Sequence, residues 1–197
     1  RDAAAAVLEA WYPGEAGGEA IARVLLGQAE PGGRLPVTFY HATDDLPPFA
    51  DYALKDMLGG RPYRYFSGQP DAPFGFGLGF GDVAFGPTRH VAGAFETTLH
   101  NNGTRATTAV PEFYVFPPDG DMRPTVELAG VQRVPLQPGE SRVVRFQASP
   151  DAFSFADARG AMHRVLGAYR GAILSAAPVG GQPPSSAAAF SIGAKTP

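Results

Sequence analysis

The sequence predicts two regions of different fold class: the end of an α/β sandwich domain over residues 1–80, and an all-β sandwich over residues 81–197. The first region runs from an apolar segment through a glycine-rich turn to an amphipathic helix and a strand, which is the order of elements in an α/β unit. The second consists of short alternating runs separated by turn residues, a pattern typical of an antiparallel β-sandwich. We place the boundary at residue 80, where the patterning changes.

The clearest element of the first region is a short helix over residues 18–27, with the sequence GEAIARVLLG. Ile21, Val24 and Leu25 fall on one helical face. Gly27 stands where a residue in the left-handed conformation would end the helix. These features predict an amphipathic helix of two to three turns that packs through one side.

The segments on either side of this helix are less regular. The apolar run from Ala3 to Trp11 fits either a buried strand or the end of a helix, and its pattern does not decide between them. After the helix, residues 32–39 (GGRLPVTF) alternate Leu35, Val37 and Phe39. This alternation predicts a strand with those three side chains turned inward.

Residues 41–80 hold many prolines, glycines and aromatic residues with little periodicity, which predicts a long, irregular but packed segment. Gly75, Gly77 and Gly79 could let the backbone approach a phosphate group. That kind of site needs a helix N-terminus after the glycines, and β-type sequence follows instead. We therefore interpret the glycines as positions of tight packing. Tyr65 is expected in the same packed core, so Tyr65→Ala should destabilise by roughly 3–5 kcal/mol.

The second region contains recognisable strands and turns. In residues 94–104, Phe95, Thr97 and Leu99 lie on one face and an Asn-Gly turn follows. Residues 134–146 read as two strands joined by a Pro-Gly turn. Further strands are expected within residues 110–121 and at the final FSIGA, and together these elements predict a sandwich of about 100 residues.

Composition excludes several classes of function. The net charge is −3, with 18% charged residues, so the chain has no basic surface for nucleic acid or an anionic membrane. No apolar run reaches the roughly 20 residues that span a bilayer. Without cysteine there is no thiolate metal site and no cysteine nucleophile. The four histidines are scattered, and the DGD at 119–121 lacks the other positions of a calcium loop. We expect no metal and no cofactor.

Acidic and aromatic residues of the first region offer two candidate sites. Glu15 and Glu19 flank the helix start, where acidic side chains usually interact with the helix dipole. The alternative is that Glu15 lies at the end of a strand, where open α/β sheets bind ligands. Aromatic and arginine side chains could stack on sugar rings and bind their hydroxyls, or could wedge the segment against both domains. We favour the wedge for this second set, which comprises Arg61, Tyr63, Arg64, Tyr65 and Phe66.

Several motifs in order resemble the C-terminal part of family 3 glycoside hydrolases, most closely the bacterial β-xylosidase branch. AWYPGEAGGEAIARVLLGQAEPGGRLPVTFY, DLPPFADYALK, GRPYRYF and PFGFGLGF resemble the end of the α/β sandwich domain. TLHNNGTRATTAVPEFYVFPPDG, RPTVELAGVQRVPLQPGESRVVRFQ and LGAYRGAIL are similar to the fibronectin type III-like (immunoglobulin-like) domain that follows in many of these enzymes. Nearly the whole chain is covered by the resemblance.

This resemblance implies a retaining, exo-acting β-glycosidase, most plausibly a β-xylosidase and next a β-glucosidase, that hydrolyses plant cell-wall oligosaccharides. Its aspartate nucleophile and glutamate acid/base would lie upstream of Arg1, so we assign no catalytic residue and expect the chain alone to be inactive. Sugar contacts are carried over only to Asp51, Tyr52, Tyr63 and Arg64. The chain departs from the family pattern by extra residues around 56–59 and by Pro62 in place of threonine.

The expected partners are the preceding part of a longer enzyme and an oligosaccharide substrate, with neither nucleic acid nor membrane. The start at Arg1, directly before an apolar element, also suggests a piece of something longer. A homo-oligomer remains an option, and we favour a periplasmic or extracellular location in a bacterium. The alternative reading is a non-catalytic carbohydrate-binding, spacer or oligomerisation module.

Overall fold

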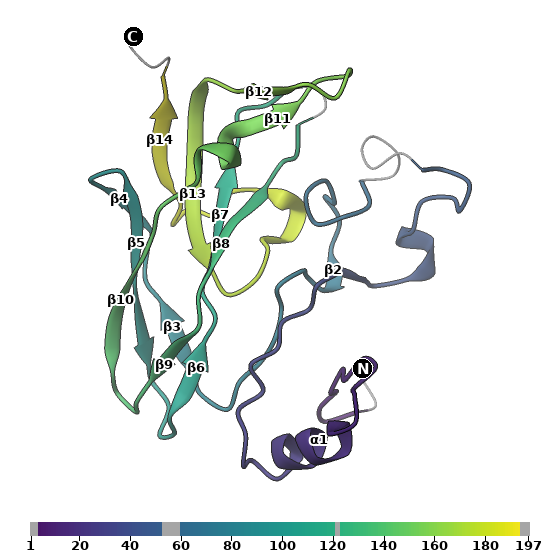
Figure 1. Ribbon diagram of the computed structural model, residues 1–197, viewed down its shortest axis with the longest axis vertical. Coiled ribbons are helices and arrows are strands. Elements are labelled where there is room, and N and C mark those ends of the chain that lie inside the picture. The colour runs from purple at the N-terminus through teal and green to yellow at the C-terminus, as the bar shows by residue number, and fades with distance from the viewer. Residues whose placement is uncertain (1–3, 53–59, 121–122, 194–197) are drawn as a thin grey trace.

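The structure is a computed structural model that describes residues 4–52, 60–120 and 123–193. Figure 1 shows a β-sandwich formed by the C-terminal two thirds of the chain and an extended N-terminal region that runs along it. This arrangement confirms the predicted order of an α/β portion followed by an all-β sandwich. The extra residues at 56–59 lie outside the described residues.

Two four-stranded antiparallel sheets form the sandwich. In the first sheet the order is β10 (Ser141–Phe146), β5 (Ala94–Asn101) and β3 (Val83–Phe85), and β4 (Arg89–Val91) also pairs with β5. In the second the order is β14 (Ala188–Ile192), β13 (Gly167–Leu174), β7 (Glu112–Phe116) and β8 (Glu127–Val131).

Three short strand pairs and three 3₁₀ turns complete the fold. The pairs are β1 (Phe39–Tyr40) with β2 (Pro70–Ala72), β6 (Thr107–Ala109) with β9 (Val134–Leu136), and β11 (Ser154–Ala156) with β12 (Met162–Arg164). The 3₁₀ turns are η1 (Thr43–Asp45), η2 (Pro150–Phe153) and η3 (Val179–Gly181). The predicted Pro-Gly turn joins β9 to β10, and Gly139 has the positive φ of 71° that such a turn requires.

The core between the two sheets follows from the alternation of strand side chains. On β5, Phe95, Thr97 and Leu99 are all buried, as predicted. Thr97 is polar, but its hydroxyl donates to the Gly86 carbonyl at 2.7 Å. The buried hydroxyl therefore has a hydrogen-bond partner. The facing sheet contributes Phe113, whose ring centroid lies 4.5 Å from that of Phe95.

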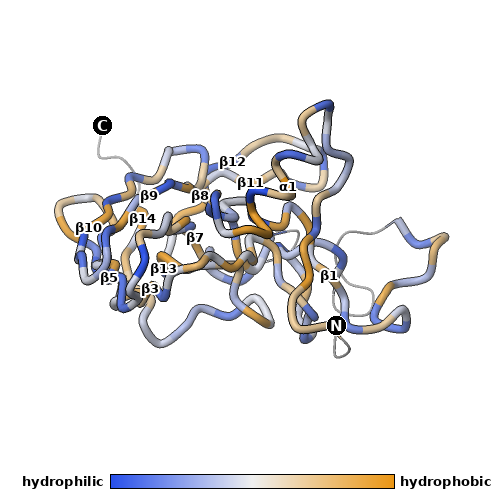
Figure 2. Tube along the Cα trace, turned by 90° about the horizontal axis from the view of Figure 1, so that it is seen from below, coloured by the Kyte–Doolittle hydropathy of each residue, from blue (hydrophilic) through white to orange (hydrophobic). Residues whose placement is uncertain are grey.

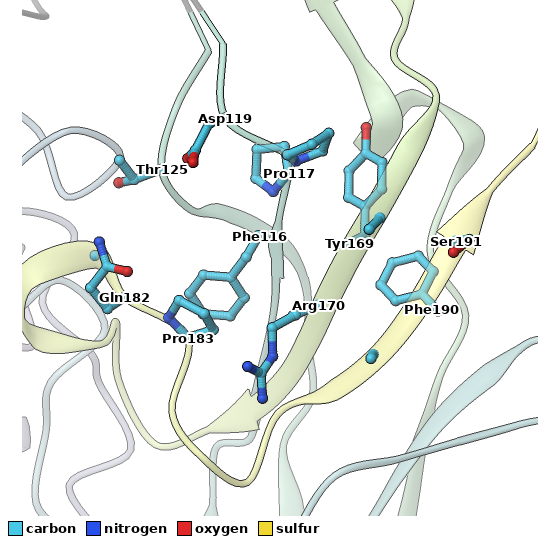
Figure 3. Close-up of a pocket in the computed structure, with 14 residues that line it drawn as sticks. Phe116, Pro117, Asp119, Thr125, Tyr169, Arg170, Gln182, Pro183, Phe190 and Ser191 are labelled. Carbon is cyan, nitrogen blue, oxygen red and sulfur yellow. The ribbon is translucent and has the colours of Figure 1, made fainter.

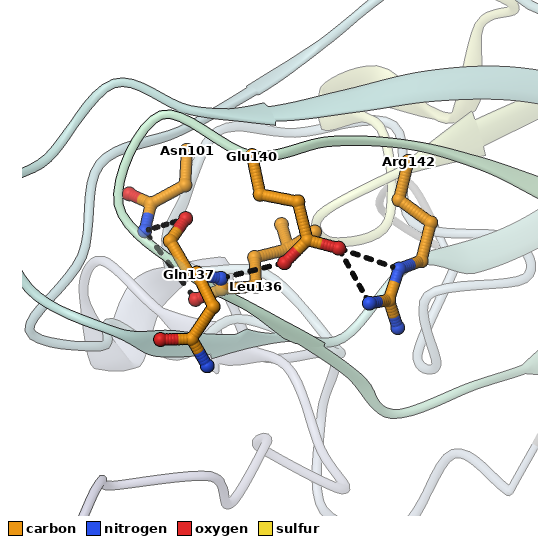
Figure 4. Close-up of polar contacts among 5 residues, drawn as sticks. All are labelled: Asn101, Leu136, Gln137, Glu140 and Arg142. Carbon is orange, nitrogen blue, oxygen red and sulfur yellow. Dashed lines mark hydrogen bonds and ion pairs between the residues drawn. The ribbon is translucent and has the colours of Figure 1, made fainter.

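Asn101 at the end of β5 ties together the loops at one end of the sandwich (Figure 4). Its side chain is fully buried, and its Nδ2 donates to the carbonyls of Arg105 at 2.8 Å and Gln137 at 3.1 Å. Its Oδ1 accepts a hydrogen bond from the amide of Gly103 at 3.0 Å. Glu140 caps the same turn by accepting from the Gln137 amide. This network holds the loop that carries Arg105 in one conformation.

The α-helix of the N-terminal region, within its described residues, is α1 (Gly17–Leu25), close to the predicted range. Gly27 follows with φ of +70°, which confirms its expected role at the helix end. Glu19 lies in the first turn and is 4.0 Å from Arg23 one turn later, as the helix-stabilising interpretation requires. Leu25, however, is largely exposed, whereas Ile21 is partly buried.

The strand predicted over residues 32–39 is wrong for most of its length, because only its last residue, Phe39, belongs to a strand. Pro36 lacks an amide proton, and Val37 is exposed rather than turned inward. Leu35 still makes extended-chain hydrogen bonds, since its amide donates to Phe76 and its carbonyl accepts from Gly75. The segment is therefore pinned at one residue instead of forming a ladder.

The helices in the described parts of the chain are short. The longest, α1, has nine residues, and no helix among the described residues is long and apolar enough to cross a membrane. Figure 2 shows that apolar segments occur along the N-terminal region as well as in the strands of the sandwich. Apolar character is therefore not confined to the sandwich core.

Candidate functional site

The site with the most contacts is the seam, which we define as the contact between residues 27–80 and the sandwich, made mainly by the outer face of the β14-β13-β7-β8 sheet and partly by residues 105–107. That face carries a second buried cluster, separate from the core between the sheets, with Tyr114, Phe116 and Ala172 among its members. Tyr63 and Phe74 of the N-terminal region pack against it. All five residues of β7 are buried, because Phe113 and Val115 face inward while Tyr114 and Phe116 face the seam.

Aromatic stacking holds the centre of the seam. The rings of Tyr63 and Phe74 are stacked with their centroids 4.2 Å apart, and Tyr114 meets Tyr63 edge-on at 6.3 Å. The Tyr63 hydroxyl also accepts a hydrogen bond from the Leu128 amide of β8 at 3.2 Å. Burial raises the pKa of this hydroxyl. Tyr63 therefore joins the N-terminal region to two strands of the sandwich.

A second group of contacts joins residues 64 and 125–127. Arg64 forms an ion pair with Glu127 of β8, and the Arg64 carbonyl accepts from both the amide and the hydroxyl of Thr125. Burial raises the pKa of Glu127, and the charge and hydrogen bond of Arg64 oppose that effect. The backbone and the side chain of Arg64 are thus both used in the seam.

Glu112, at the start of β7, is a carboxylate placed in the interior of the seam and only 3% exposed. The Tyr114 hydroxyl donates to its Oε2. Burial raises the pKa of Glu112 to about 6, against the lowering effects of the Tyr114 hydrogen bond and the charge of Arg34. The backbone of Gly75 lies directly over the carboxylate, so that a β-carbon at this position would come within 2.0 Å of Oε2.

Residues 27–34 make a row of polar contacts along the sandwich. The guanidinium of Arg105 donates to the Gly27 carbonyl at 3.1 Å, and so binds the C-terminal end of α1, where the helix dipole favours a cation. Its charge also lies 5.1 Å from the centroid of the Phe80 ring. Glu30 accepts from the Thr107 hydroxyl at 2.6 Å and from the Phe80 amide at 3.0 Å. Contacts with the sandwich therefore fix the position of the segment that follows α1.

The glycines of residues 75–81 serve close packing, as the sequence predicts, and polar side chains are among their neighbours. A β-carbon on Gly79 would lie 2.4 Å from the Glu30 carboxylate, and one on Gly81 would lie 2.4 Å from Thr107. Gly75 likewise approaches Glu112. Carboxylate and hydroxyl groups, rather than aromatic rings alone, occupy the space that the missing side chains leave.

The four residues carried over as sugar contacts fall into two places. Tyr63 and Arg64 lie in the seam, with their functional groups bonded to the sandwich. Asp51 and Tyr52 lie in the segment that follows η1, where the Asp51 amide donates to the Pro48 carbonyl and the Tyr52 side chain is 81% exposed.

The neighbouring aromatic residues correct one expectation. Tyr65 is only partly buried, whereas Phe66 beside it is 7% exposed and meets Tyr40 edge-on with 5.0 Å between centroids. The core position is therefore Phe66, one residue later than predicted, because Tyr65 sits at the side of the turn begun by Pro62. The large destabilisation expected for Tyr65→Ala should apply to Phe66 instead.

Sequence reasoning missed Glu112, Arg34 and Arg105 as seam residues. A signal was available for Glu112, because it is the one charged residue in the apolar run VPEFYVF, and a charge in a buried strand normally has a dedicated environment. Arg34 and Arg105 lie in polar, turn-rich sequence, where nothing distinguishes them from solvated arginines.

A groove of about 640 Å³ is the other candidate site, on the same outer face beside β13 and β14 (Figure 3). Asp119, Arg170 and Gln182 surround an apolar centre that includes Phe116 and Pro183. Phe116 is buried, so it presents no open ring face on which a sugar could stack. Among the described residues there is also no group of three or more histidine and acidic side chains that could hold a metal ion.

An all-β sandwich preceded by an α/β portion that packs on the outer face of one of its sheets defines the class: a chain of two regions of different fold class. Two family models match the chain. The glycosyl hydrolase family 3 C-terminal domain matches residues 1–81, and the fibronectin type III-like domain matches residues 109–173.

Known proteins agree with these matches. The chain is 34% identical over 165 residues to a xylan 1,4-beta-xylosidase of Xylanibacter ruminicola, covering 78% of this chain and 18% of that protein. It is 32% identical over 171 residues to a periplasmic beta-glucosidase of Salmonella typhimurium, covering 76% of this chain and 22% of the other. The crystal structure of a Bifidobacterium adolescentis GH3 beta-glucosidase superposes with a TM-score of 0.75 at 25% identity, covering 93% of this chain and 29% of that one.

The chain therefore belongs to glycosyl hydrolase family 3 and corresponds to its C-terminal part. It spans about a fifth of the length of these curated relatives.

Proposed function

We propose that these residues are the C-terminal portion of a retaining, exo-acting β-glycosidase that hydrolyses plant cell-wall oligosaccharides. A β-xylosidase is the first choice and a β-glucosidase the second, in keeping with the names of the two relatives above. The role of this portion is to complete an α/β domain with residues 1–80 and to brace that domain with the sandwich. We assign the nucleophile and the acid/base to the preceding part, and we expect the 197 residues alone to be inactive.

One observation carries this proposal: the N-terminal region is buried on its sandwich side and apolar on its free side. Leu25 and Leu26 at the end of α1 are each 71% exposed. Tyr12, Phe49 and Leu78 of the same region are also exposed. Large exposed apolar side chains at several places in one region favour an interaction surface there. We assign the preceding part of the α/β domain as the partner that covers it, in line with the greater length of the relatives.

The four carried-over residues divide by role in this proposal. Tyr63 and Arg64 support the segment from behind, since their polar groups are bonded to the sandwich. Tyr52 has an open side chain and Asp51 adjoins it, so this pair is the better candidate for contact with a bound sugar. The substrate itself would bind mainly to the preceding domains.

A carbohydrate-binding or spacer module is the second candidate, and the groove beside β13 and β14 is the feature that favours it. A binding module should hold xylo-oligosaccharide without the rest of the enzyme. The buried state of Phe116 in the groove weakens this candidate. A homo-oligomer would instead use the exposed apolar side chains of the N-terminal region.

The test compares the 197-residue chain with the longer protein that carries it, using aryl β-xyloside and aryl β-glucoside as substrates. We expect turnover only by the longer protein. In that protein Leu25→Asp should lower activity at least tenfold, because a charge would enter the covered face of α1. Val143→Asp, on the exposed face of β10, is the matched control and should leave activity unchanged.

Three results would contradict the proposal. Turnover by the 197-residue chain alone would place catalytic groups within it. Full activity of the Leu25→Asp protein would show that the exposed face of α1 is not covered. Binding of xylotriose by the 197-residue chain, with no hydrolysis by the longer protein, would favour the binding module.

A further inference from the structure

We propose that Glu112 is a pH-sensitive latch of the seam, which holds the N-terminal region firmly against the sandwich in mildly acidic solution and loosens it as the carboxyl group loses its proton. This inference deepens the proposed bracing role and rests on it. It concerns the regulation of the seam and not the chemistry of hydrolysis.

The surroundings of Glu112 suit a neutral carboxyl group better than a carboxylate. The side chain is 3% exposed, and its hydrogen-bond partner among the described residues is the hydroxyl of Tyr114 on the same strand. A carboxylate can accept several hydrogen bonds. Removing it from water costs free energy when the protein supplies fewer hydrogen bonds than the water did. The amide of Gly75, whose backbone lies against the carboxylate, donates to the Leu35 carbonyl and so is already used.

Charged groups near Glu112 compensate its charge only in part. Arg34 of the N-terminal region is the nearest cation, but its Nη1 donates to the Gly33 carbonyl and its Nε is buried without a hydrogen-bond partner among the described residues. Burial lowers the pKa of Arg34, and the like charge of Arg133 adds to this effect.

The remaining titratable groups around the latch are Glu30 and Tyr63. Both Glu30 and Glu112 interact with the charge of Arg34, so Glu30 competes with Glu112 for it. Tyr63 faces Glu112 from the N-terminal region, and burial keeps its hydroxyl neutral, so it offers no countercharge. When Glu112 is ionised, its buried negative charge is therefore only partly neutralised, because the cation that acts on it, Arg34, is shared with Glu30.

The direction of the pH effect follows from linkage. Burial raises the pKa of Glu112 to about 6, above the ordinary value of 4.5 that it regains when the seam opens. A group with a raised pKa contributes its full stabilisation below the lower value and loses it as the pH rises through the higher one. The latch is therefore closed near pH 4.5 and weakens between about pH 4.5 and pH 7. The whole effect is about 30-fold in the opening equilibrium.

Amide hydrogen exchange of the 197-residue chain tests the latch, because two amides report directly on the seam. The Leu35 amide donates to Phe76 and the Gly75 amide donates to Leu35, immediately over Glu112. After correction for intrinsic exchange, their protection should fall about 15-fold from pH 4.5 to pH 7.5, which is the part of the whole effect that lies in this pH range. The Ile173 amide, which donates to Thr88 inside the sandwich, is the internal control and should not follow this change.

Two variants sharpen the experiment. Glu112→Gln removes the titration but keeps an oxygen for the Tyr114 hydroxyl, so protection of Leu35 and Gly75 should become independent of pH. Glu15→Gln removes an exposed carboxylate beside α1 and should keep the wild-type response. Should Glu112→Gln not fold, a carbon-13 titration of the Glu112 carboxyl in the wild-type chain gives its pKa directly. A value near 6 supports the latch, and a value of 4.5 or below overturns it.

The outcomes separate the latch from the bracing role. Equal protection of Leu35 and Gly75 at both pH values overturns the latch and leaves the bracing role intact. A pH response that persists in Glu112→Gln also overturns the latch. A third outcome is that the Leu35 and Gly75 amides are unprotected at both pH values while the Ile173 amide is still protected. The seam would then not form, and both proposals would fail.

Discussion

Each face of the β14-β13-β7-β8 sheet carries a buried cluster, but the two clusters are built in different ways. The inner face meets the other sheet in a core made of strand side chains such as Phe95, Phe113 and Ile173. The outer face meets the N-terminal region through a smaller buried cluster, the stacked rings of Tyr63 and Phe74, the ion pair of Arg64 with Glu127, and a buried glutamate. The inner contact is apolar and internal to the sandwich, whereas the outer one is mixed and joins segments far apart in sequence.

This difference shows which part of the chain can fold by itself. The sandwich encloses its own core, so its stability should not depend on the N-terminal region. The N-terminal region has the sandwich on one side and exposed apolar side chains on the other. It therefore needs the sandwich and, in our proposal, the preceding domain as well.

The largest loss of stability is expected when a residue of the inner face is replaced. Phe113 is fully buried and its ring contacts those of Phe95 and Phe146. Phe113→Ala should destabilise the chain by about 3–5 kcal/mol, because it removes contacts and leaves a cavity. Urea unfolding followed by circular dichroism measures the change. Val143→Ala, on the exposed side of β10, should change stability by less than about 0.5 kcal/mol.

A smaller effect should result when the outer face is disturbed at Gly75. Gly75→Ala combines an unfavourable φ of +79° with a clash against Glu112. Gly93→Ala is a matched control, since Gly93 has φ of +77° and open space around it. We expect a loss of about 1 kcal/mol for Gly93→Ala and at least about 2 kcal/mol for Gly75→Ala. Equal losses would mean that the backbone conformation, and not contact with Glu112, requires the glycine.

The smallest effect compares one ion pair from each region in double-mutant cycles. Arg64 and Glu127 are paired across the seam, where both side chains are partly covered. Arg145 and Glu96 are paired on the outer side of the sandwich at 2.8 Å. Coupling should be about 1 kcal/mol for the seam pair and about 0.5 kcal/mol or less for the surface pair. A stronger coupling in the surface pair would contradict the assignment of Arg64 to the seam.

The sandwich was predictable from sequence because its strands carry local signals. Phe95, Thr97 and Leu99 alternate as a half-buried strand should, and Gly139 follows a proline in a turn. These features depend on residues within a few positions of one another. The family resemblance, carried by several ordered motifs, identified both regions.

The seam was not predictable in the same way, because its contacts join residues distant in sequence. Glu112 meets Gly75, and Arg105 meets Gly27, across separations that no local pattern encodes. The strand expected through Val37 failed for a related reason, since its alternation assumed a neighbouring strand over its whole length. The buried position was assigned to Tyr65 instead of Phe66, because a turn sets which of two adjacent aromatic residues points inward.

The double burial of β7 has a consequence for how freely its sequence can vary. Most strands at a protein surface accept substitutions at every second position. In Glu112–Phe116 none of the five positions faces solvent. A saturation scan through this strand should therefore show an unbroken block of intolerant positions, whereas a scan through β10 should alternate, with Val143 tolerant and Val144 intolerant.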